Sequence, residues 1–262
     1  MANDTPDDWK QYEDFAVGID TNRLPSTQDL AGRTFELTFG AERLRLGFQS
    51  SGRVLWDDAP EPQGEVRYDA VRVAPPTYFI DMTFSSTPRE ALTVIMNTVT
   101  HRAMSVRQRV RDRRVEGEPL VEQHFTAGVV DAHVAALGST VPGPTRDLIG
   151  LRAFYRYSPL HLYEHVYLSS QRYCWQCLVG EQRGHGDVDL ATTWKFDEDQ
   201  YVFAFREFII PVASVFFYNF RDLRSTGKFL GLSGGGRIEN RNAGAFIQKA
   251  SITHYEPGTE PV

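Results

Sequence analysis

The sequence of 262 residues contains no apolar run near the ~18 residues that a membrane-spanning helix needs. Its acidic N-terminal segment also lacks the hydrophobic stretch of a secretory signal peptide. These absences argue against a membrane partner and lead us to expect a cytoplasmic protein.

Positive charge is scarce as well, because the formal net charge is −6. Proteins that bind nucleic acid through phosphate contacts normally present a basic face, so we expect no nucleic-acid partner. One arginine-rich stretch runs from Arg107 to Arg114. Its arginines alternate between Arg107 and Arg113 as they would along a strand, which favours a solvated strand face over a binding patch.

Only two cysteines occur, Cys174 and Cys177, in the pattern Cys-Trp-Gln-Cys. A C-x-x-C pair can be a redox or metal motif. This pair lies in a segment that looks like a strand, where residues three apart point to opposite faces, and no helix signal follows it. No other cluster has zinc-ligand spacing. We therefore expect no metal and no cofactor.

Helical periodicity is confined to the first 28 residues, where Trp9, Tyr12 and Phe15 recur at helical spacing. This region is predicted to be an arm or short helix that packs on a barrel. From residue 29 onward, short β-branched and aromatic runs alternate with turn residues. The fold class is therefore predicted to be all-β.

The chain also repeats itself. The segment that begins Asp29-Leu-Ala-Gly recurs 118 positions later as Asp147-Leu-Ile-Gly, and Trp56 then matches Trp175 after a one-residue shift. A repeat of this length suits a duplicated small barrel. We predict two tandem lipocalin-like antiparallel β-barrels, at residues 29–135 and 145–262, joined by a linker at 136–144.

The two copies differ at three matched positions, where the second copy has polar residues and the first has hydrocarbons. Tyr155 replaces Leu37, Tyr157 replaces Phe39, and Glu207 replaces Phe84. A buried carboxylate is costly unless it has a partner, so Glu207 indicates a proton-transfer site with the two phenols as hydrogen-bond donors. The alternative is that Glu207 lies at the barrel mouth in water.

Other residues of the second copy are candidates for binding a substrate. Tyr163 and His165 alternate along one strand face, although a histidine between tyrosines is more often structural. Arg183 lies in a glycine-punctuated loop that could provide a cation at the barrel mouth, although such loops are usually only turns. Trp175 and Phe205 add aromatic surface.

Several segments resemble the MoaF family, among them Thr145-Arg-Asp-Leu-Ile-Gly, Tyr163-Glu-His-Val-Tyr-Leu and Tyr173-Cys-Trp-Gln-Cys, with Asp7-Asp-Trp-Lys in the first half. The resemblance covers essentially the whole chain. It implies the calycin (lipocalin-like) fold and a place in monoamine or aromatic-compound metabolism.

A more distant resemblance links the second copy to phenolic acid decarboxylases, which are cofactor-free β-barrels. It is carried by Tyr155-x-Tyr157, Tyr163-Glu164 and Phe205-Arg206-Glu207. This similarity implies that Glu207, Tyr155 and Tyr157 are catalytic, and Arg183 is a weaker match to the family's arginine.

Three hypotheses follow. The first is a cofactor-independent lyase, a decarboxylase or a related C–C-cleaving or isomerising enzyme, that acts on a small phenolic compound. The second is a non-catalytic lipocalin-like protein that binds a small aromatic ligand. The third is a structural or regulatory dimerisation module with filled barrels. A homodimer is compatible with each of them.

Overall fold

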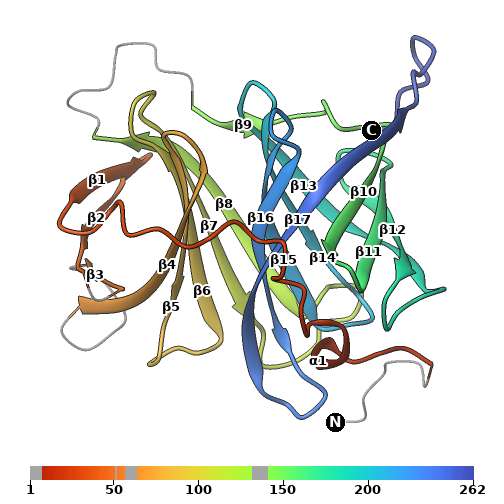
Figure 1. The fold of residues 1–262 in the computed structure, drawn as a ribbon, viewed down its shortest axis with the longest axis horizontal. Coiled ribbons are helices and arrows are strands. Elements are labelled where there is room, and N and C mark those ends of the chain that lie inside the picture. Colours follow the sequence, from red (N-terminus) through yellow and green to blue (C-terminus); the bar gives the residue numbers. More distant parts are fainter. Residues whose placement is uncertain (1–7, 51, 57–63, 132–140) are drawn as a thin grey trace. The chain divides into compact units, whose positions relative to one another are not determined.

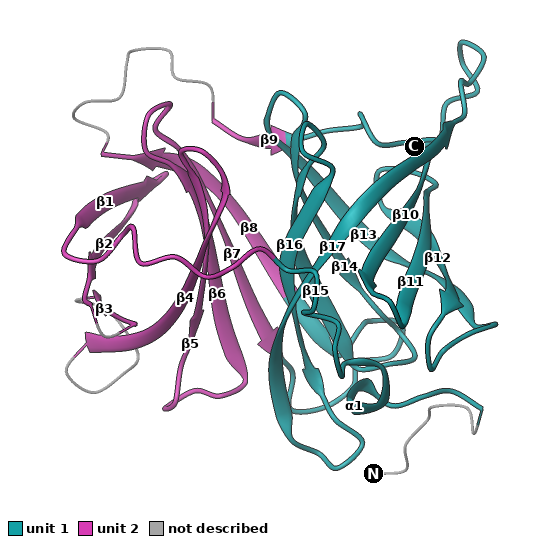
Figure 2. Ribbon diagram, viewed as in Figure 1, with its two compact units in different colours: residues 1–23, 110–122, 144–262 teal, residues 24–109, 123–143 magenta. Residues whose placement is uncertain are grey.

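The computed structural model describes residues 8–262 except residues 51, 57–63 and 132–140 (Figure 1). The chain divides into two compact units (Figure 2). Unit 1 contains Met1–Arg23, Val110–Glu122 and Pro144–Val262, and unit 2 contains Leu24–Arg109 and Gln123–Gly143. The prediction of an all-β chain with two tandem barrels is confirmed.

The first barrel is a closed antiparallel sheet of eight strands in chain order. Its strands are β1 (Thr34–Phe39), β2 (Glu42–Phe48), β3 (Arg53–Trp56), β4 (Glu65–Ala74), β5 (Thr77–Thr83), β6 (Glu90–Asn97), β7 (Arg102–Val110) and β8 (Val121–Val130). The barrel closes where Leu37 of β1 pairs with Val130 of β8. Alternate residues of each strand face inward, so Phe35, Leu37 and Phe39 of β1 are buried.

The second barrel repeats this meander. It contains β10 (Leu151–Ser158), β11 (His161–Tyr167), β12 (Arg172–Val179), β13 (Gly186–Asp197), β14 (Gln200–Arg206), β15 (Val212–Asn219), β16 (Arg224–Leu232) and β17 (Ile238–Ile252), while the short β9 (Gly143–Pro144) pairs with β13. Pairing of β10 with β17 and of β12 with β13 closes the sheet. A barrel of about eight strands is wide enough for side chains or one small ligand.

The duplication is visible in the turn that precedes the first strand of each barrel. Gly32 N–H donates to Phe48 O, and Gly150 N–H donates to Tyr167 O, both at 2.8 Å. Both glycines have positive φ angles, 76° and 87°. At Gly150 a Cβ atom would also lie 2.5 Å from the carbonyl oxygen of Thr253. Glycine is therefore required there for two reasons, the positive φ angle and the close approach of this oxygen. The sequence repeat is therefore a repeat of backbone geometry.

The N-terminal arm carries the only helix of the described residues, α1 (Tyr12–Phe15). Tyr12, Phe15 and Ile19 are buried in the same core as the aromatic residues inside the second barrel. Farther along, Ser26 bridges to Val71 in unit 2. Most of the predicted linker at 136–144 lies outside the described residues, and Gly143 and Pro144 within it form β9.

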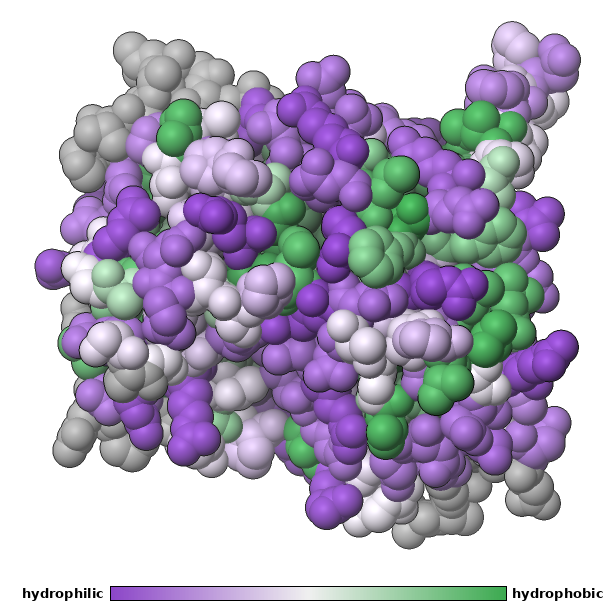
Figure 3. All heavy atoms as spheres, in the orientation of Figure 1, coloured by the Kyte–Doolittle hydropathy of each residue, from purple (hydrophilic) through white to green (hydrophobic). Residues whose placement is uncertain are grey.

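Within the described residues, no helix is long and apolar enough to cross a membrane. Exposed apolar side chains such as Leu223 and Phe246 occur among hydrophilic neighbours, and the face drawn in Figure 3 mixes both kinds. On β7, the side chains of Arg107 and Arg109 face acidic partners, Glu42 at 3.7 Å and Glu90 at 3.9 Å. This pairing fits the solvated strand face that the alternation predicts.

Candidate functional site

A cavity lies inside the second barrel. The predicted site residues that line it are Tyr157, Tyr163, His165, Trp175, Phe205 and Glu207. Its other lining residues are Phe15, Ile19, Tyr173, Gln182 and Phe229. The volume of the cavity is about 30 Å³. The cavity is therefore narrow and largely aromatic.

The N-terminal arm covers this cavity with Phe15 and Ile19. The Tyr12 hydroxyl donates to the carbonyl oxygen of Phe229 at 3.1 Å. At the start of the arm, the Trp9 ring packs edge-on against Trp175 at 5.9 Å. Contacts at and just before the start of α1 thus hold the arm against the second barrel, and Phe15 at the end of α1 lies in the cavity wall.

Glu207 comes directly after β14, and its backbone N–H donates to Val212 O at 3.0 Å. Only 6% of the residue is exposed. Its carboxyl group has no hydrogen bond to another described residue. Burial raises the pKa of this carboxyl group well above its usual value, and the charges of Asp189 and Asp187 raise it further. Burial therefore favours the protonated form of Glu207 beside the cavity.

A second buried carboxyl group, Asp189 on β13, lies near Glu207. It accepts hydrogen bonds from Trp175 Nε1 at 2.9 Å and from the N–H of Phe208 at 3.2 Å. Burial raises the pKa of Asp189 to about 7. The sequence analysis missed this residue, although its alternation with the inward-facing Ala191 is a usable signal.

Tyr163 and Gln182 form a hydrogen-bonded pair in the cavity wall. The Tyr163 hydroxyl donates to Gln182 Oε1 at 2.9 Å. Gln182 is 2% exposed although it belongs to a turn. Gly180 and Gly184 flank it with φ angles of 140° and 92°, which lets this turn fold back so that the glutamine side chain enters the barrel. Sequence reasoning selected the next residue, Arg183, and missed Gln182.

Arg183 is exposed and does not line the cavity. Neighbouring residues of this turn point in different directions, so Gln182 takes the inward position and Arg183 the outward one. Among the described residues that line the cavity there is therefore no arginine to provide a counter-charge for a carboxylate.

Tyr155 also lies outside the cavity lining, although it shares a strand face with Tyr157. Its hydroxyl forms a hydrogen bond of 2.6 Å with the Tyr167 hydroxyl, and its ring lies 5.1 Å from that of Tyr218. Burial raises the pKa of Tyr155 and of Tyr157 above the usual value for tyrosine. Side chains two apart on a strand lie at different depths in the barrel, and this difference separates the two phenols.

His165 lines the cavity, and its ring also lies 4.3 Å from that of Tyr155, whose hydroxyl is hydrogen-bonded to Tyr167 outside the cavity lining. Burial lowers the pKa of His165 to about 3, so the imidazole is neutral. A neutral imidazole can donate or accept a hydrogen bond, but it carries no charge to a ligand.

The cysteine pair lies on β12, with Cys177 buried among the core residues and Cys174 partly exposed on the other face. Burial raises the pKa of both thiols, which opposes formation of a reactive thiolate. Among the described residues, no group of three His, Cys, Asp or Glu side chains is placed to hold a metal ion.

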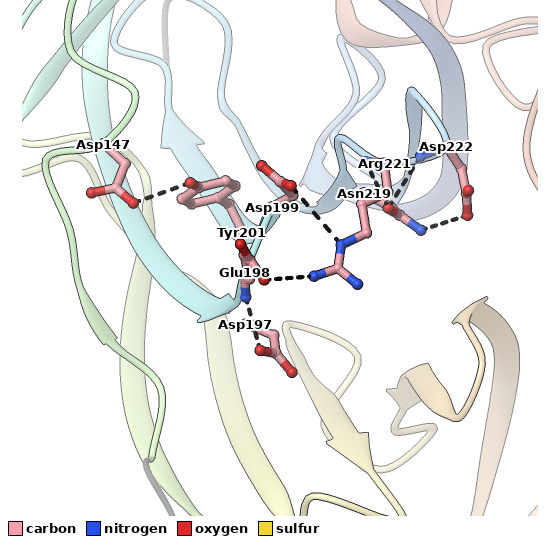
Figure 4. Close-up of polar contacts among 8 residues, drawn as sticks. All are labelled: Asp147, Asp197, Glu198, Asp199, Tyr201, Asn219, Arg221 and Asp222. Atoms are coloured by element: carbon pink, nitrogen blue, oxygen red, sulfur yellow. Dashed lines mark hydrogen bonds and ion pairs between the residues drawn. The ribbon is translucent and has the colours of Figure 1, made fainter.

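At the other end of β14, acidic residues gather around Tyr201 (Figure 4). Asp147 accepts hydrogen bonds from the Tyr201 hydroxyl at 3.1 Å and from Lys195 at 2.6 Å. Arg221 pairs with Glu198 at 3.1 Å and lies 3.9 Å from Asp199. Three carboxylates here face two cations, and these ion pairs are largely exposed, which suits a structural role.

The first barrel provides an internal comparison for the cavity. There, Phe84 takes the position of Glu207, and its ring lies 6.0 Å from Trp56, the counterpart of Trp175. Phe84 is buried in the core of the first barrel. The same backbone position is therefore occupied by a packed hydrocarbon side chain in the first barrel and by an acid beside a cavity in the second.

Fold and site together define a class of protein: two tandem eight-stranded barrels, the second of which encloses an aromatic cavity with a buried carboxylic acid. The chain belongs to the MoaF family. Residues 7–112 match the MoaF N-terminal domain, and residues 142–253 match the MoaF C-terminal domain.

A relative described as protein MoaF, from Klebsiella aerogenes, is 29% identical over 249 residues, which are 90% of this chain and 92% of that protein. Among solved structures, a putative beta-lactamase from Burkholderia vietnamiensis matches 41% of this chain and all of its own chain, with a TM-score of 0.35 and 13% identity.

Proposed function

We propose that the second barrel is a cofactor-independent lyase or isomerase that moves a proton to or from a small phenolic compound. The observation that carries this proposal is the buried acid Glu207 in the wall of an aromatic cavity. A carboxyl group with a raised pKa can donate a proton at neutral pH and take it back later, as general acid–base catalysis requires.

The flat cavity walls suit an aromatic ring. A para-hydroxyl group on that ring would let electrons flow into a quinone-methide form when Glu207 protonates a side-chain carbon and the phenol releases its own proton. In an isomerisation, the Glu207 carboxylate then takes a different proton from the side chain. In a cleavage, it takes the hydroxyl proton of a side-chain carbinol, whose carbon leaves as a neutral carbonyl compound. In either case the electrons of the broken bond restore the aromatic ring, and the ring oxygen regains its proton. Tyr157 would orient the substrate by a hydrogen bond.

Decarboxylation is the form of this reaction that the geometry supports least. The lining residues include no lysine or arginine, and Arg183 points away. Bringing a carboxylate into such a site without a counter-charge costs several kcal/mol. C–C cleavage or isomerisation of an uncharged phenol avoids this cost.

The test is the variant Glu207→Gln, which keeps the shape of the side chain and removes its acid. We expect turnover to fall by roughly 100-fold or more if Glu207 transfers the proton. The assay incubates the protein with hydroxycinnamates, aromatic amines and diaryl lignin fragments and measures products by mass spectrometry. Glu181→Gln, at an exposed position beside the same turn, is the control. Unchanged turnover in Glu207→Gln on a verified substrate would refute the mechanism.

A second candidate function is a non-catalytic carrier or sensor for a small aromatic ligand. The arm favours it, because a cavity that Phe15 and Ile19 cover resembles a storage site. This function predicts tight binding with no product from any compound that binds, so the same assay distinguishes it.

A further inference from the structure

The cavity wall contains a hydrogen-bond donor with no acceptor. Gln182 Nε2 is buried and has no hydrogen-bond partner within the described residues. At the other end of this amide, Gln182 Oε1 accepts from Tyr163, whose hydroxyl lies beside the Cys177 thiol. Buried polar groups in proteins are almost always satisfied, so an unused amide in a cavity wall points to a ligand atom.

That ligand atom must be an acceptor, since an amide nitrogen can only donate. The hydroxyl groups of Tyr157 and Tyr173 and the acid of Glu207 also line the cavity without a hydrogen bond to another described residue. Each of these groups can donate a proton to an acceptor. The wall therefore offers several donors. Of these groups, only Gln182 Nε2 cannot also accept a hydrogen bond.

The charge of the site limits the ligand further. Among the described residues, no lysine or arginine lines the cavity, and two acidic residues, Glu207 and Asp189, are buried in or behind its wall. A carboxylate would lie there without a counter-charge. An ammonium group brings only donors and would leave Gln182 Nε2 unsatisfied.

We infer that the cavity selects an uncharged aromatic carbonyl compound, whose carbonyl oxygen accepts a hydrogen bond from Gln182 Nε2. This inference rests on the proposed function and names the substrate class of the same site. In a proton transfer at the carbon beside that carbonyl, negative charge would grow on the oxygen, and Gln182 would stabilise it while Glu207 handles the proton.

The test compares four probes of similar size by titration calorimetry at neutral pH: 4-hydroxyacetophenone, 4-ethylphenol, 4-hydroxybenzoate and 4-hydroxybenzylamine. We expect the ketone to bind the wild-type protein at least tenfold more tightly than each of the other three. Equal or tighter binding of the benzoate or the amine would overturn the inference without the use of any variant.

Gln182→Leu then removes the donor while it keeps the volume of the side chain nearly unchanged. Affinity for the ketone should fall about tenfold, and affinity for 4-ethylphenol should not fall. Gln171→Leu, at an exposed position on the same barrel, is the matched control and should bind both probes as the wild type does. An equal loss for both probes in Gln182→Leu would show that the amide only supports the wall, and it would overturn the inference.

The two proposals can fail separately. If the ketone is preferred through Gln182 but no carbonyl compound is turned over, the substrate class stands and the catalytic function falls. If another class of compound is turned over in a Glu207-dependent manner, the catalytic function stands and the substrate class falls.

Discussion

Asp189 and Glu207 lie inside the second barrel, where burial opposes ionisation of a carboxyl group. Neither has a basic partner among the residues that line the cavity. Asp189 receives two hydrogen bonds and still has a pKa of about 7, whereas Glu207 receives none. At the residue scale, the two acids therefore differ in how readily each releases its proton, which is the condition for assigning them different roles.

This burial predicts how stability depends on pH. The pKa of Asp189 is raised from about 3.9 in the unfolded chain to about 7 in the fold. The folded state therefore binds the proton more tightly, and the free energy of unfolding should fall as pH rises from about 4 to 7. We expect Asp189→Asn to reduce the loss of stability between pH 5 and pH 8, measured by urea unfolding.

Asp20→Asn, at an exposed position on the N-terminal arm, is the control for that measurement. It should leave the pH dependence of the wild type nearly unchanged. An Asp189→Asn protein with the same loss of stability between the two pH values would contradict the assignment.

The two tyrosines that the sequence groups together should behave differently. Tyr155→Phe leaves the Tyr167 hydroxyl without its 2.6 Å partner inside the core, which should reduce the free energy of unfolding by about 1–3 kcal/mol. Ligand affinity should not change. Tyr157→Phe removes a hydroxyl that has no protein partner, so it should weaken ligand binding with little change in stability. Thermal unfolding measures the stability of both variants, and calorimetry measures their ligand affinity. Equal changes in the two variants would contradict the separation of the roles of Tyr155 and Tyr157.

At the scale of elements, the arm contributes Phe15 and Ile19 to the cavity wall, and we predict that it controls access to the cavity. Trp9 holds its start by packing against Trp175 and against His185, with ring centroids 5.9 and 5.3 Å apart. We expect Trp9→Ala to release the arm, so that amides of residues 12–19 exchange hydrogen faster and ligands associate faster. Hydrogen exchange by mass spectrometry and stopped-flow binding measure these effects. Val17→Ala, at a position 68% exposed, is the matched control. Hydrogen exchange of the arm that is as slow in Trp9→Ala as in the wild type would contradict the role of the arm as a cover of the cavity.

Turn residues and alternation predict strands such as β1 and β12, which bury every second residue. Other strands, such as β14 and β15, are buried on both faces, and their apolar and aromatic runs predict them instead. The arm helix also follows from the spacing of Trp9, Tyr12 and Phe15. Its place over the second barrel does not follow, since that contact joins α1 to Phe229, more than two hundred residues away in the chain. Gln182 was missed for a related reason: whether a turn residue points inward depends on local φ angles, which hydropathy does not encode.

At the scale of the whole molecule, the duplication identifies candidate site residues by comparison of the two copies. Comparison of the two copies selected Glu207 and Tyr157, which both line the cavity, but also Tyr155, which does not. A matched position shows that a residue has changed, but not how deep in the barrel it lies. Both barrels have the same turn geometry and strand order, so what distinguishes them is the chemistry of a few inward positions.

This specialisation predicts opposite effects on stability when residues are exchanged between the copies. Glu207→Phe replaces an unpartnered buried acid with a hydrocarbon, so it should raise the melting temperature while it abolishes turnover. Phe84→Glu places an acid against Trp56 in a hydrocarbon core, and it should destabilise the protein by several kcal/mol. Phe84→Leu, the control, should cost less than about 1.5 kcal/mol. The predicted increase follows from the expectation that a destabilising buried carboxyl group is kept only where its proton is used. A lower melting temperature for Glu207→Phe would instead mean that the acid supports the fold.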